Sequence, residues 1–276
     1  MIAWALSSCS SIKTVVYELT SPLLEEHSFI KIVLIADLHG TIYGNDQTIL
    51  IDKIKNENPD LIILCGDIID EVYPITGARL LLSGICDLAP IYYVTGNHEY
   101  YTERIKEIRY ELEYYKVIIL SDRYVQIKIN NNEIILAGIE DPDKALFETP
   151  DYDQEEIMED VFRELDDIQL YKILIAHRPE LIELYKKYSF DLILSGHTHG
   201  GQIRFFGSKM GLYAPNQGLF PKYSGGLYKH ALSKTHGSLE THKGVTHIIS
   251  RGLSVNRLPR IFNPPELVVV IIKPEY

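Results

Sequence analysis

The chain has 276 residues, of which 46% are hydrophobic and 24% charged, and its formal net charge is −11. This composition is that of a globular protein, and it excludes the disordered, fibrous and disulfide-rich classes. The acidic balance argues against a general affinity for nucleic acid, because phosphate backbones are held chiefly by Lys and Arg. A metal centre can nevertheless create a local positive field inside an acidic protein.

Residues 1–29 are expected to form an extension that packs on the main domain or leads into it. The first six residues are apolar but far too short to span a bilayer. The stretch that ends at Cys9 resembles a lipoprotein box, but no apolar region of signal-peptide length precedes it, so we expect no lipidation. Three cysteines form no disulfide framework. We expect a cytoplasmic or peripherally membrane-associated protein.

Residues 30–276 are expected to form one domain, because apolar strand patterns alternate with helical patterns and the turns between them are short. Strands are predicted at 32–36, 61–65, 91–95, 125–129, 134–137, 172–176, 191–195 and 267–272, and helices at 46–56, 100–115, 154–165 and 180–188. This order predicts a layered α/β domain. Residues 205–247 are irregular and rich in Gly, Tyr, Ser, Lys and His, which is typical of a functional or mobile segment on the substrate side.

Five of the predicted strands end in residue types that bind metals. Asp37-Leu38-His39 follows the first strand, residues 66–70 (GDIID) the second and residues 96–99 (GNHE) the third. His177 and residues 196–199 (GHTH) end two later strands. Sites in α/β sheets assemble at the carboxyl ends of strands. A single strand-end Asp is often a helix N-cap, and a lone His is often only a satisfied polar residue, but five such motifs in order predict one metal site.

Spacing supports this prediction. In an extended chain, residues two apart project to one side, so Asp37 and His39 can share one metal, and His197 and His199 can reach a common centre. Glycines at 66, 96 and 196 let the backbone turn tightly. Carboxylate, amide and imidazole ligands suit Mn, Fe or Zn, and the motifs contain no cysteine.

These blocks resemble the pattern of the calcineurin-like metallophosphoesterases, which is DxH, GDxxD, GNH(D/E), a lone His and GHxH. The chain is most similar to the YkuE-like bacterial phosphodiesterases, which share the extended GHTHGGQ at residues 196–202 and a C-terminal block like residues 250–266. The resemblance implies a bacterial origin and an α/β fold, a four-layer αββα sandwich of two mixed β-sheets flanked by helices.

The resemblance also implies a dinuclear metal centre with two divalent ions, Mn²⁺ being favoured and Fe, Zn or Mg possible. One metal would be held by Asp37, His39, Asp67 and His199, and the other by Asp67, Asn97, His177 and His197, with Asp67 bridging. The implied activity is hydrolysis of a phosphodiester or pyrophosphate bond by attack of a metal-bridging hydroxide.

His98 would act as general acid or stabilise charge on the phosphoryl oxygens. Asp70 would orient His98, its alternative role being a helix N-cap. Arg178 could contact the substrate phosphate or pair with Glu180 or Asp191, and Arg251 is similar. Four further histidines are interpreted as surface residues rather than as a second metal site, namely His230, His236, His242 and His247.

Other functions remain open at this point. The same site could serve a phosphomonoesterase or a lipid-linked sugar-nucleotide pyrophosphatase. A non-catalytic metal-binding scaffold is the alternative from another class, and a nuclease would need a basic groove. The expected partner is a phosphoester small molecule or a lipid-linked substrate, with peripheral membrane contact possible and no specific nucleic acid. The sequence leaves the physiological substrate and the oligomeric state open.

Overall fold

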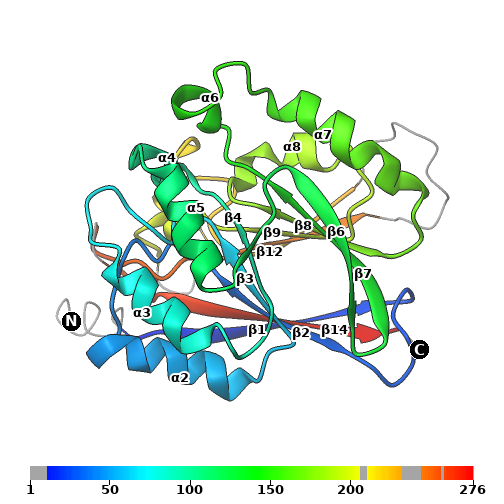
Figure 1. Ribbon diagram of the computed structural model, residues 1–276, viewed down its shortest axis with the longest axis horizontal. Coiled ribbons are helices and arrows are strands. Elements are labelled where there is room, and N and C mark those ends of the chain that lie inside the picture. Colours follow the sequence, from blue (N-terminus) through cyan, green and yellow to red (C-terminus); the bar gives the residue numbers. More distant parts are fainter. Residues whose placement is uncertain (1–10, 206–209, 232–243, 256–257, 276) are drawn as a thin grey trace.

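Two six-stranded sheets stack face to face in the centre of the molecule (Figure 1). The computed structural model describes residues 11–205, 210–231, 244–255 and 258–275. In spatial order, the first sheet contains β1 (Lys13–Ser21), β14 (Glu266–Pro274), β2 (Ile30–Ile35), β3 (Leu61–Cys65), β4 (Ile91–Val94) and β5 (Ile118–Ile119). Strands β2 to β5 run parallel to one another, whereas β14 runs antiparallel to β2.

The second sheet is also mixed. Its strands, in spatial order, are β12 (Gly226–His230), β13 (Val245–Ile249), β9 (Leu192–Ser195), β8 (Tyr171–Ala176), β7 (Asn132–Ile139) and β6 (Arg123–Ile129). The four inner strands are parallel, and the two edge strands are antiparallel to their neighbours. A separate two-stranded hairpin pairs β10 (Tyr213–Ala214) with β11 (Gly218–Leu219).

Helices cover both outer faces of the stacked sheets. The first sheet carries α2 (Thr48–Glu57), α3 (Thr76–Ile85) and α5 (Ile105–Tyr114), and the second carries α7 (Gln154–Phe162) and α8 (Ile182–Tyr185). Short elements complete the chain, namely α4 (Asn97–Tyr101), α6 (Lys144–Phe147), and 3₁₀ turns at Asn45–Gln47, Arg163–Asp167, Pro179–Leu181 and His199–Gly201. The predicted sandwich of two mixed sheets flanked by helices is confirmed.

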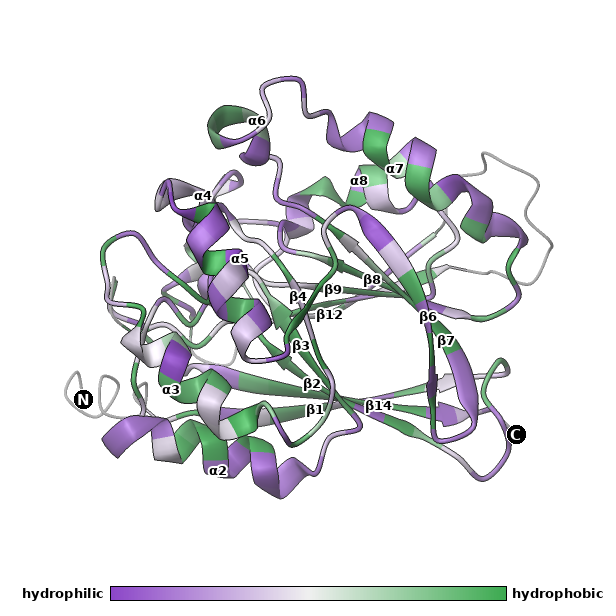
Figure 2. Cartoon of the chain, viewed as in Figure 1, coloured by the Kyte–Doolittle hydropathy of each residue, from purple (hydrophilic) through white to green (hydrophobic). Residues whose placement is uncertain are grey.

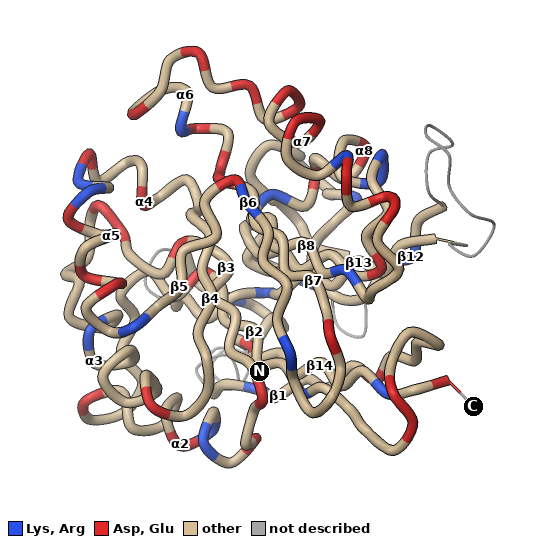
Figure 3. Tube along the Cα trace, turned by 45° about the vertical axis from the view of Figure 1, so that its right-hand side comes forward, with Lys and Arg blue, Asp and Glu red and all other residues tan. Residues whose placement is uncertain are grey.

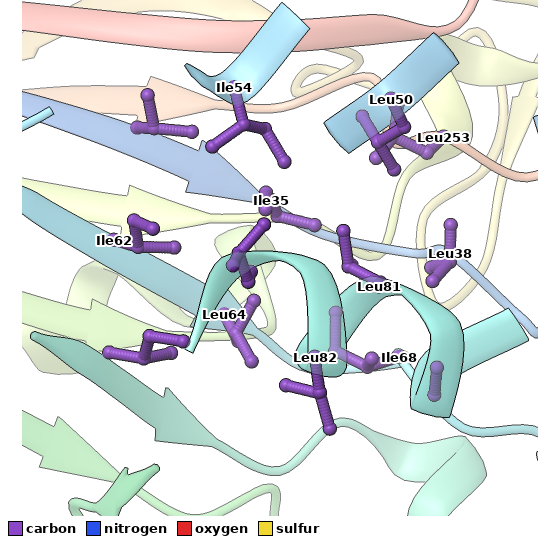
Figure 4. Packing of buried hydrophobic residues seen from close by; sticks show 14 of the residues in the cluster. Ile35, Leu38, Leu50, Ile54, Ile62, Leu64, Ile68, Leu81, Leu82 and Leu253 are labelled. Carbon is purple, nitrogen blue, oxygen red and sulfur yellow. The ribbon is translucent and has the colours of Figure 1, made fainter. Parts of the chain in front are cut away.

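The central strands are continuous apolar runs in the sequence because both faces of each strand are buried. In β3, Ile62 and Leu64 pack under helices α2 and α3 (Figure 4), whereas Ile63 faces the second sheet. A third cluster lies between the second sheet and helices α7 and α8. Figure 2 shows the same division, with apolar strands inside and polar outer faces on the helices. Each fully buried aliphatic side chain contributes about 1.5–3 kcal/mol, so these layers hold the strand ends firmly.

Several elements were not predicted from the sequence, among them the short β5, α6, β10 and β11. The predicted helix at 100–115 is broken between α4 and α5, and α3 was not predicted. The segment 205–247, expected to be irregular, contributes β12 to the second sheet. Residues 13–21 of the expected extension form an edge strand paired along its whole length with β14. Among the described helices, none combines the length and apolar character needed to cross a membrane.

Candidate metal centre

The five predicted motifs follow parallel strands of the two sheets. Residues 37–39, 66–70 and 96–99 follow β2, β3 and β4 of the first sheet, whereas His177 and residues 196–199 follow β8 and β9 of the second. Backbone hydrogen bonds tie the loops together, since Asp37 N–H donates to the Gly66 carbonyl and Gly196 N–H donates to the His177 carbonyl, each at 3.1 Å. Ligand-type side chains from both sheets therefore converge.

Five of these ligand-type residues have a left-handed backbone conformation, with a positive φ angle. The φ angles are 51° at Asp37, 47° at His39, 54° at Asp67, 69° at His197 and 48° at His199. Non-glycine residues rarely adopt this conformation, which costs on the order of 1–3 kcal/mol each and tends to occur at functional sites. The expectation that residues two apart share a side because the chain is extended is therefore wrong here, although the side chains do converge.

The first group of possible ligands contains Asp37, His39, Asp67 and His199, all of them buried. One ligand atom from each lies within 4.8 Å of the others. Nε2 of His39 is 3.2 Å from Nε2 of His199 and 3.6 Å from Oδ2 of Asp67. Nε2 of His199 is 3.5 Å from Oδ1 of Asp37. Two imidazole nitrogens and two carboxylates thus face one point, which is a donor set for a divalent cation.

The second group shares Asp67 with the first and adds His177 and His197. Nε2 of His177 lies 3.1 Å from Oδ2 of Asp67 but makes no hydrogen bond, and neither does the buried Oδ1 of Asn97, among the described residues. Buried polar atoms without partners are rare, because their desolvation is uncompensated. A cation at this group would satisfy both atoms, so these residues fit a metal ion.

Two of the ligand histidines are held in the neutral form that binds metals. Burial and the neighbouring His177 lower the pKa of His197 to about 3, and burial together with His39 holds the pKa of His199 well below its usual value. Both rings are therefore neutral at ordinary pH and keep a lone pair for a metal. Burial opposes ionisation of Asp67, but His177 and His98 hold the pKa of that carboxyl well below its usual range.

Outer contacts orient two of these ligands. Nδ1 of His177 donates to the Cys65 carbonyl at 2.8 Å. Nε2 of His197 lies 3.0 Å from Oδ1 of Asn216, and 3.7 Å from the mostly buried carboxylate of Glu180. Metal-binding histidines usually donate their second ring N–H in this way, which fixes the tautomer. Asn216 lies in the segment predicted to be irregular, so no pattern in the sequence pointed to it.

Glu99 holds two of the metal loops in place. Its carboxylate accepts the N–H groups of Asp67, Ile68, Ile69 and Gly96 at 2.8–3.0 Å. Burial and the nearby Asp67 raise the pKa of Glu99 to about 7 despite these hydrogen bonds. Glu99 was not predicted to belong to the site, although its place in the GNHE motif was a usable signal.

The structure places two carboxylates beside His98, and the nearer one is not the residue expected. Nδ1 of His98 lies 2.6 Å from Oε2 of Glu71 but 3.8 Å from Oδ2 of Asp70. Asp70 instead contacts Nδ1 of His39 at 2.6 Å and accepts the N–H groups at 72 and 73. Asp70 thus orients a possible metal ligand, and Glu71 is the carboxylate that holds His98.

The two arginines considered for substrate binding are engaged by carboxylates. Arg178 makes a two-pronged pair with Asp141 and also contacts Asp143 at 2.7 Å. The pairing with Glu180 or Asp191 considered above is not what holds this guanidinium. Arg251 pairs with Glu266 at 2.6 Å. A role for either arginine toward substrate stays a prediction.

The remaining histidines divide into three cases. His247 is fully buried and bonds to the Ser195 hydroxyl at 2.9 Å, so its interpretation as a surface residue was wrong. The apolar strand β13 carries it into the second sheet. His230 is half-buried on β12. His236 and His242 lie outside the described residues.

Comparison with known proteins agrees with this geometry. A family model described as calcineurin-like phosphoesterase matches residues 30–201. The chain is 30% identical to the uncharacterised metallophosphoesterase YkuE of Bacillus subtilis (strain 168), over 95% of this chain and 86% of that protein. It is 28% identical to an uncharacterised metallophosphoesterase of Aquifex aeolicus (strain VF5), over 93% and 90% of the two chains.

Solved structures share the fold. NAD nucleotidase of Haemophilus influenzae superimposes with a TM-score of 0.56 at 16% identity, covering 83% of this chain and 46% of that one. A dimetal phosphatase from Danio rerio superimposes with a TM-score of 0.50 at 12% identity, covering 84% and 88%. The region matched by the family model contains the five metal-ligand motifs between residues 37 and 199. The chain therefore belongs to the calcineurin-like phosphoesterase family and is a metal-dependent phosphoester hydrolase.

Proposed function

We propose that this hydrolase cleaves a phosphodiester or pyrophosphate bond rather than a phosphomonoester. The observation that carries the proposal is the engagement of the arginines around the metal ligands. Arg178 is committed to Asp141 and Asp143, and Arg260 donates to the backbone carbonyls of Ser254 and Arg251. A monoester carries close to two negative charges on its phosphorus near neutral pH. A diester or pyrophosphate diester carries one, which needs fewer free cationic side chains.

Residues of this chain would hold two divalent cations, Mn²⁺ being the favoured metal. Asp37, His39, Asp67 and His199 would hold the first, and Asp67, Asn97, His177 and His197 the second. When bound, two such ions supply electrophilic activation of the phosphoryl group and lower the pKa of a water.

His98 would provide the proton for the leaving group. Glu71 accepts from Nδ1 of His98, which fixes the ring so that Nε2 points inward, 4.0 Å from Oδ2 of Asp67. A protonated His98 can then donate from Nε2 to the leaving-group oxygen.

The proposal is tested by comparing two soluble substrates. We expect bis(p-nitrophenyl) phosphate to be hydrolysed with a higher kcat/KM than p-nitrophenyl phosphate in the presence of Mn²⁺, and both activities to vanish on chelation. Preference for the monoester would instead indicate a phosphomonoesterase. A protein with full metal content that hydrolyses neither substrate, nor a pyrophosphate diester, would be a non-catalytic metal-binding scaffold.

A further inference from the structure

Two stretches near the end of the chain lie against ligands of the first metal group. They are residues 250–255 and 258–263, which follow β13 and precede β14, and we call them the C-terminal clamp. Neither stretch contains a possible metal ligand of the two groups that share Asp67. Their contacts with the ligand loops are nevertheless close, and the proposed function gives them no role.

The first stretch of the clamp holds Asp37. The N–H groups of Leu253 and Ser254 both donate to the Asp37 carbonyl, at 3.2 and 2.6 Å. A Cβ at position 252 would lie 2.6 Å from Cβ of Asp37 and 2.7 Å from its Oδ2, which is closer than such atoms approach. Only glycine fits there, and glycine readily adopts the φ of 71° that Gly252 has. The backbone of the clamp therefore packs directly on the carboxylate of a possible metal ligand.

The second stretch holds the turn that begins at His199. Asn263 is fully buried, and its Nδ2 donates to the carbonyls of His199 and Gln202 at 2.7 and 3.1 Å. Its Oδ1 lies so close to Gly200 that a Cβ there would be only 2.2 Å away. His199 has a left-handed conformation that is unfavourable for a residue with a side chain. Hydrogen bonds to its carbonyl help to maintain that conformation and hence the direction of the ring.

Arg260 joins the two stretches. Figure 3 shows charged residues along outer helices such as α5 and α7, whereas Arg260 is only 3% exposed. Its guanidinium donates to the carbonyls of Ser254 and Arg251 at 2.6 and 2.7 Å, and more weakly to that of His199 at 3.5 Å. A buried cation is costly unless it is well hydrogen-bonded, so these contacts fix the guanidinium and the three carbonyls together. The Asp37 side of the clamp is thus tied to its His199 side.

The clamp contacts the first group of ligands and not the second. Asp37 and His199 both belong to the first group only. In the described part of the chain, no hydrogen bond joins the clamp to Asn97, His177 or His197. The ring of His197 is held separately, since its Nε2 lies 3.0 Å from Oδ1 of Asn216 in another segment.

We propose that Asn263 and Arg260 are positioning residues that set the affinity of the first metal group, and that the second group does not depend on them. The inference rests on the two-cation assignment of the proposed function. Hydrogen bonds that orient metal ligands from outside usually change metal affinity by about 10–100-fold. The clamp would therefore decide whether the first group is filled when Mn²⁺ is scarce.

The test is equilibrium dialysis of the full chain against Mn²⁺, with elemental analysis, in two single-site backgrounds. His177→Ala should leave the first group intact, and His199→Ala the second. Adding Asn263→Ala should raise the Kd for Mn²⁺ by about 10–100-fold in the His177→Ala background. The same substitution should leave the Kd unchanged in the His199→Ala background. Arg260→Lys, which keeps the charge but not the fork of donors, should reproduce this selectivity.

Asn132→Ala provides the matched control. Asn132 is also buried, and its Nδ2 donates to the carbonyls of Ile129 and Asn130 at 3.3 and 3.2 Å. It begins β7, at the opposite end of the second sheet from the strand ends that carry the ligands. Asn132→Ala should therefore lose hydrogen bonds of the same kind and leave the Kd for Mn²⁺ unchanged in both backgrounds.

Three results would overturn the role of the clamp. Asn263→Ala could leave the Kd of the first group unchanged, it could weaken both groups equally, or Asn132→Ala could weaken the first group as much. If Asn263→Ala did not fold, as judged by circular dichroism, the same outcomes apply to Arg260→Lys. Wild-type protein that binds fewer than two Mn²⁺ would instead refute the two-cation assignment of the proposed function. Two bound Mn²⁺ with no selective effect of either variant would refute the clamp alone.

Discussion

Individual side chains in this centre differ in whether they would hold a metal or act on the substrate. His98 is adjacent to Asn97 along the chain but is held by Glu71, outside the two groups of ligands that share Asp67. Its backbone N–H donates to Oδ1 of Asp67, so the residue also helps to fix the shared carboxylate through the main chain. A substitution that keeps this N–H should spare metal binding.

His98→Ala is therefore expected to keep two bound metals and to lower kcat on a phosphodiester by about 10²–10⁴-fold, the usual contribution of a general acid. Metal content by elemental analysis and steady-state kinetics check both halves of the prediction. Glu71→Gln should give a smaller loss of kcat with the same metal content, because the ring stays hydrogen-bonded. Loss of one metal from His98→Ala would reassign this residue as a ligand.

Glu99 is expected to matter for stability rather than for chemistry. Glu99→Ala leaves four buried N–H groups without their acceptor, and hydrogen bonds to a charged group contribute about 1.5–3 kcal/mol each. Because water can enter the space left, we expect a loss of at least about 3 kcal/mol in the free energy of unfolding, measured with urea. The exposed Glu103→Ala provides the control and should stay within about 0.5 kcal/mol of the wild type. Equal stability of the two variants would contradict this role.

At the scale of elements, the strands and the positions of their polar ends could be predicted from the sequence. Strand β3 was predicted at its observed bounds, because a strand buried on both faces is a short, wholly apolar run. Gly96 was predicted to allow a close approach, and a Cβ there would lie 2.2 Å from Oδ1 of Asp67. Burial of a strand and close approach of the backbone can therefore be predicted, because each restricts the residue type at a known position.

Long-range pairings could not be predicted in the same way. Asp70 and Glu71 are adjacent in the sequence, and only the folded loop shows that Glu71 lies nearer to Nδ1 of His98, at 2.6 Å against 3.8 Å. Asn216 reaches His197 through a hairpin whose strands have only two residues each, too short for any periodicity. The break between α4 and α5 could not be predicted either, because the helical spacing of apolar residues continues across it.

Strand β13 carries one of the buried histidines that make the stability of the fold depend on pH. Burial and the nearby His230 lower the pKa of His247 from 6.5 to about 3. In the unfolded chain this imidazole takes up a proton near pH 6.5, whereas in the folded protein it stays neutral until about pH 3. The unfolded state therefore binds more protons in this window. The contribution to stability is complete above pH 6.5 and is lost as the pH falls from 6.5 toward 3.

His247→Gln should accordingly flatten the dependence of unfolding free energy on pH, by up to about 1.4 kcal/mol per pH unit between pH 6 and 4. Urea unfolding at several pH values, with chelator present for all proteins, measures this slope. The exposed His27→Gln serves as the control and should keep the wild-type slope. A wild-type slope in His247→Gln would show that His247 is protonated in the folded protein above pH 4.

The whole molecule is organised so that each metal group joins the two sheets. Asp37, His39 and Asp67 follow strands of the first sheet, whereas His177, His197 and His199 follow strands of the second. Each group of possible ligands draws on both sets. Bound cations would therefore neutralise carboxylates buried between the layers and link strand ends that the apolar core alone brings together. Metal binding should stabilise the fold as one unit, because the unfolded chain has no preformed group of ligands.

At a Mn²⁺ concentration about 100 times Kd, one site adds about 2.7 kcal/mol of stability. For a chain near this size, such a gain raises Tm by about 5–10 °C. Differential scanning calorimetry over a Mn²⁺ series should show this rise, and EDTA should reverse it. Asp67→Ala should abolish most of the rise, because one carboxylate serves both groups, whereas the exposed Asp52→Ala should keep all of it. If Asp67→Ala were stabilised as much as the wild type, the cations would bind elsewhere and the two groups would not form a shared centre.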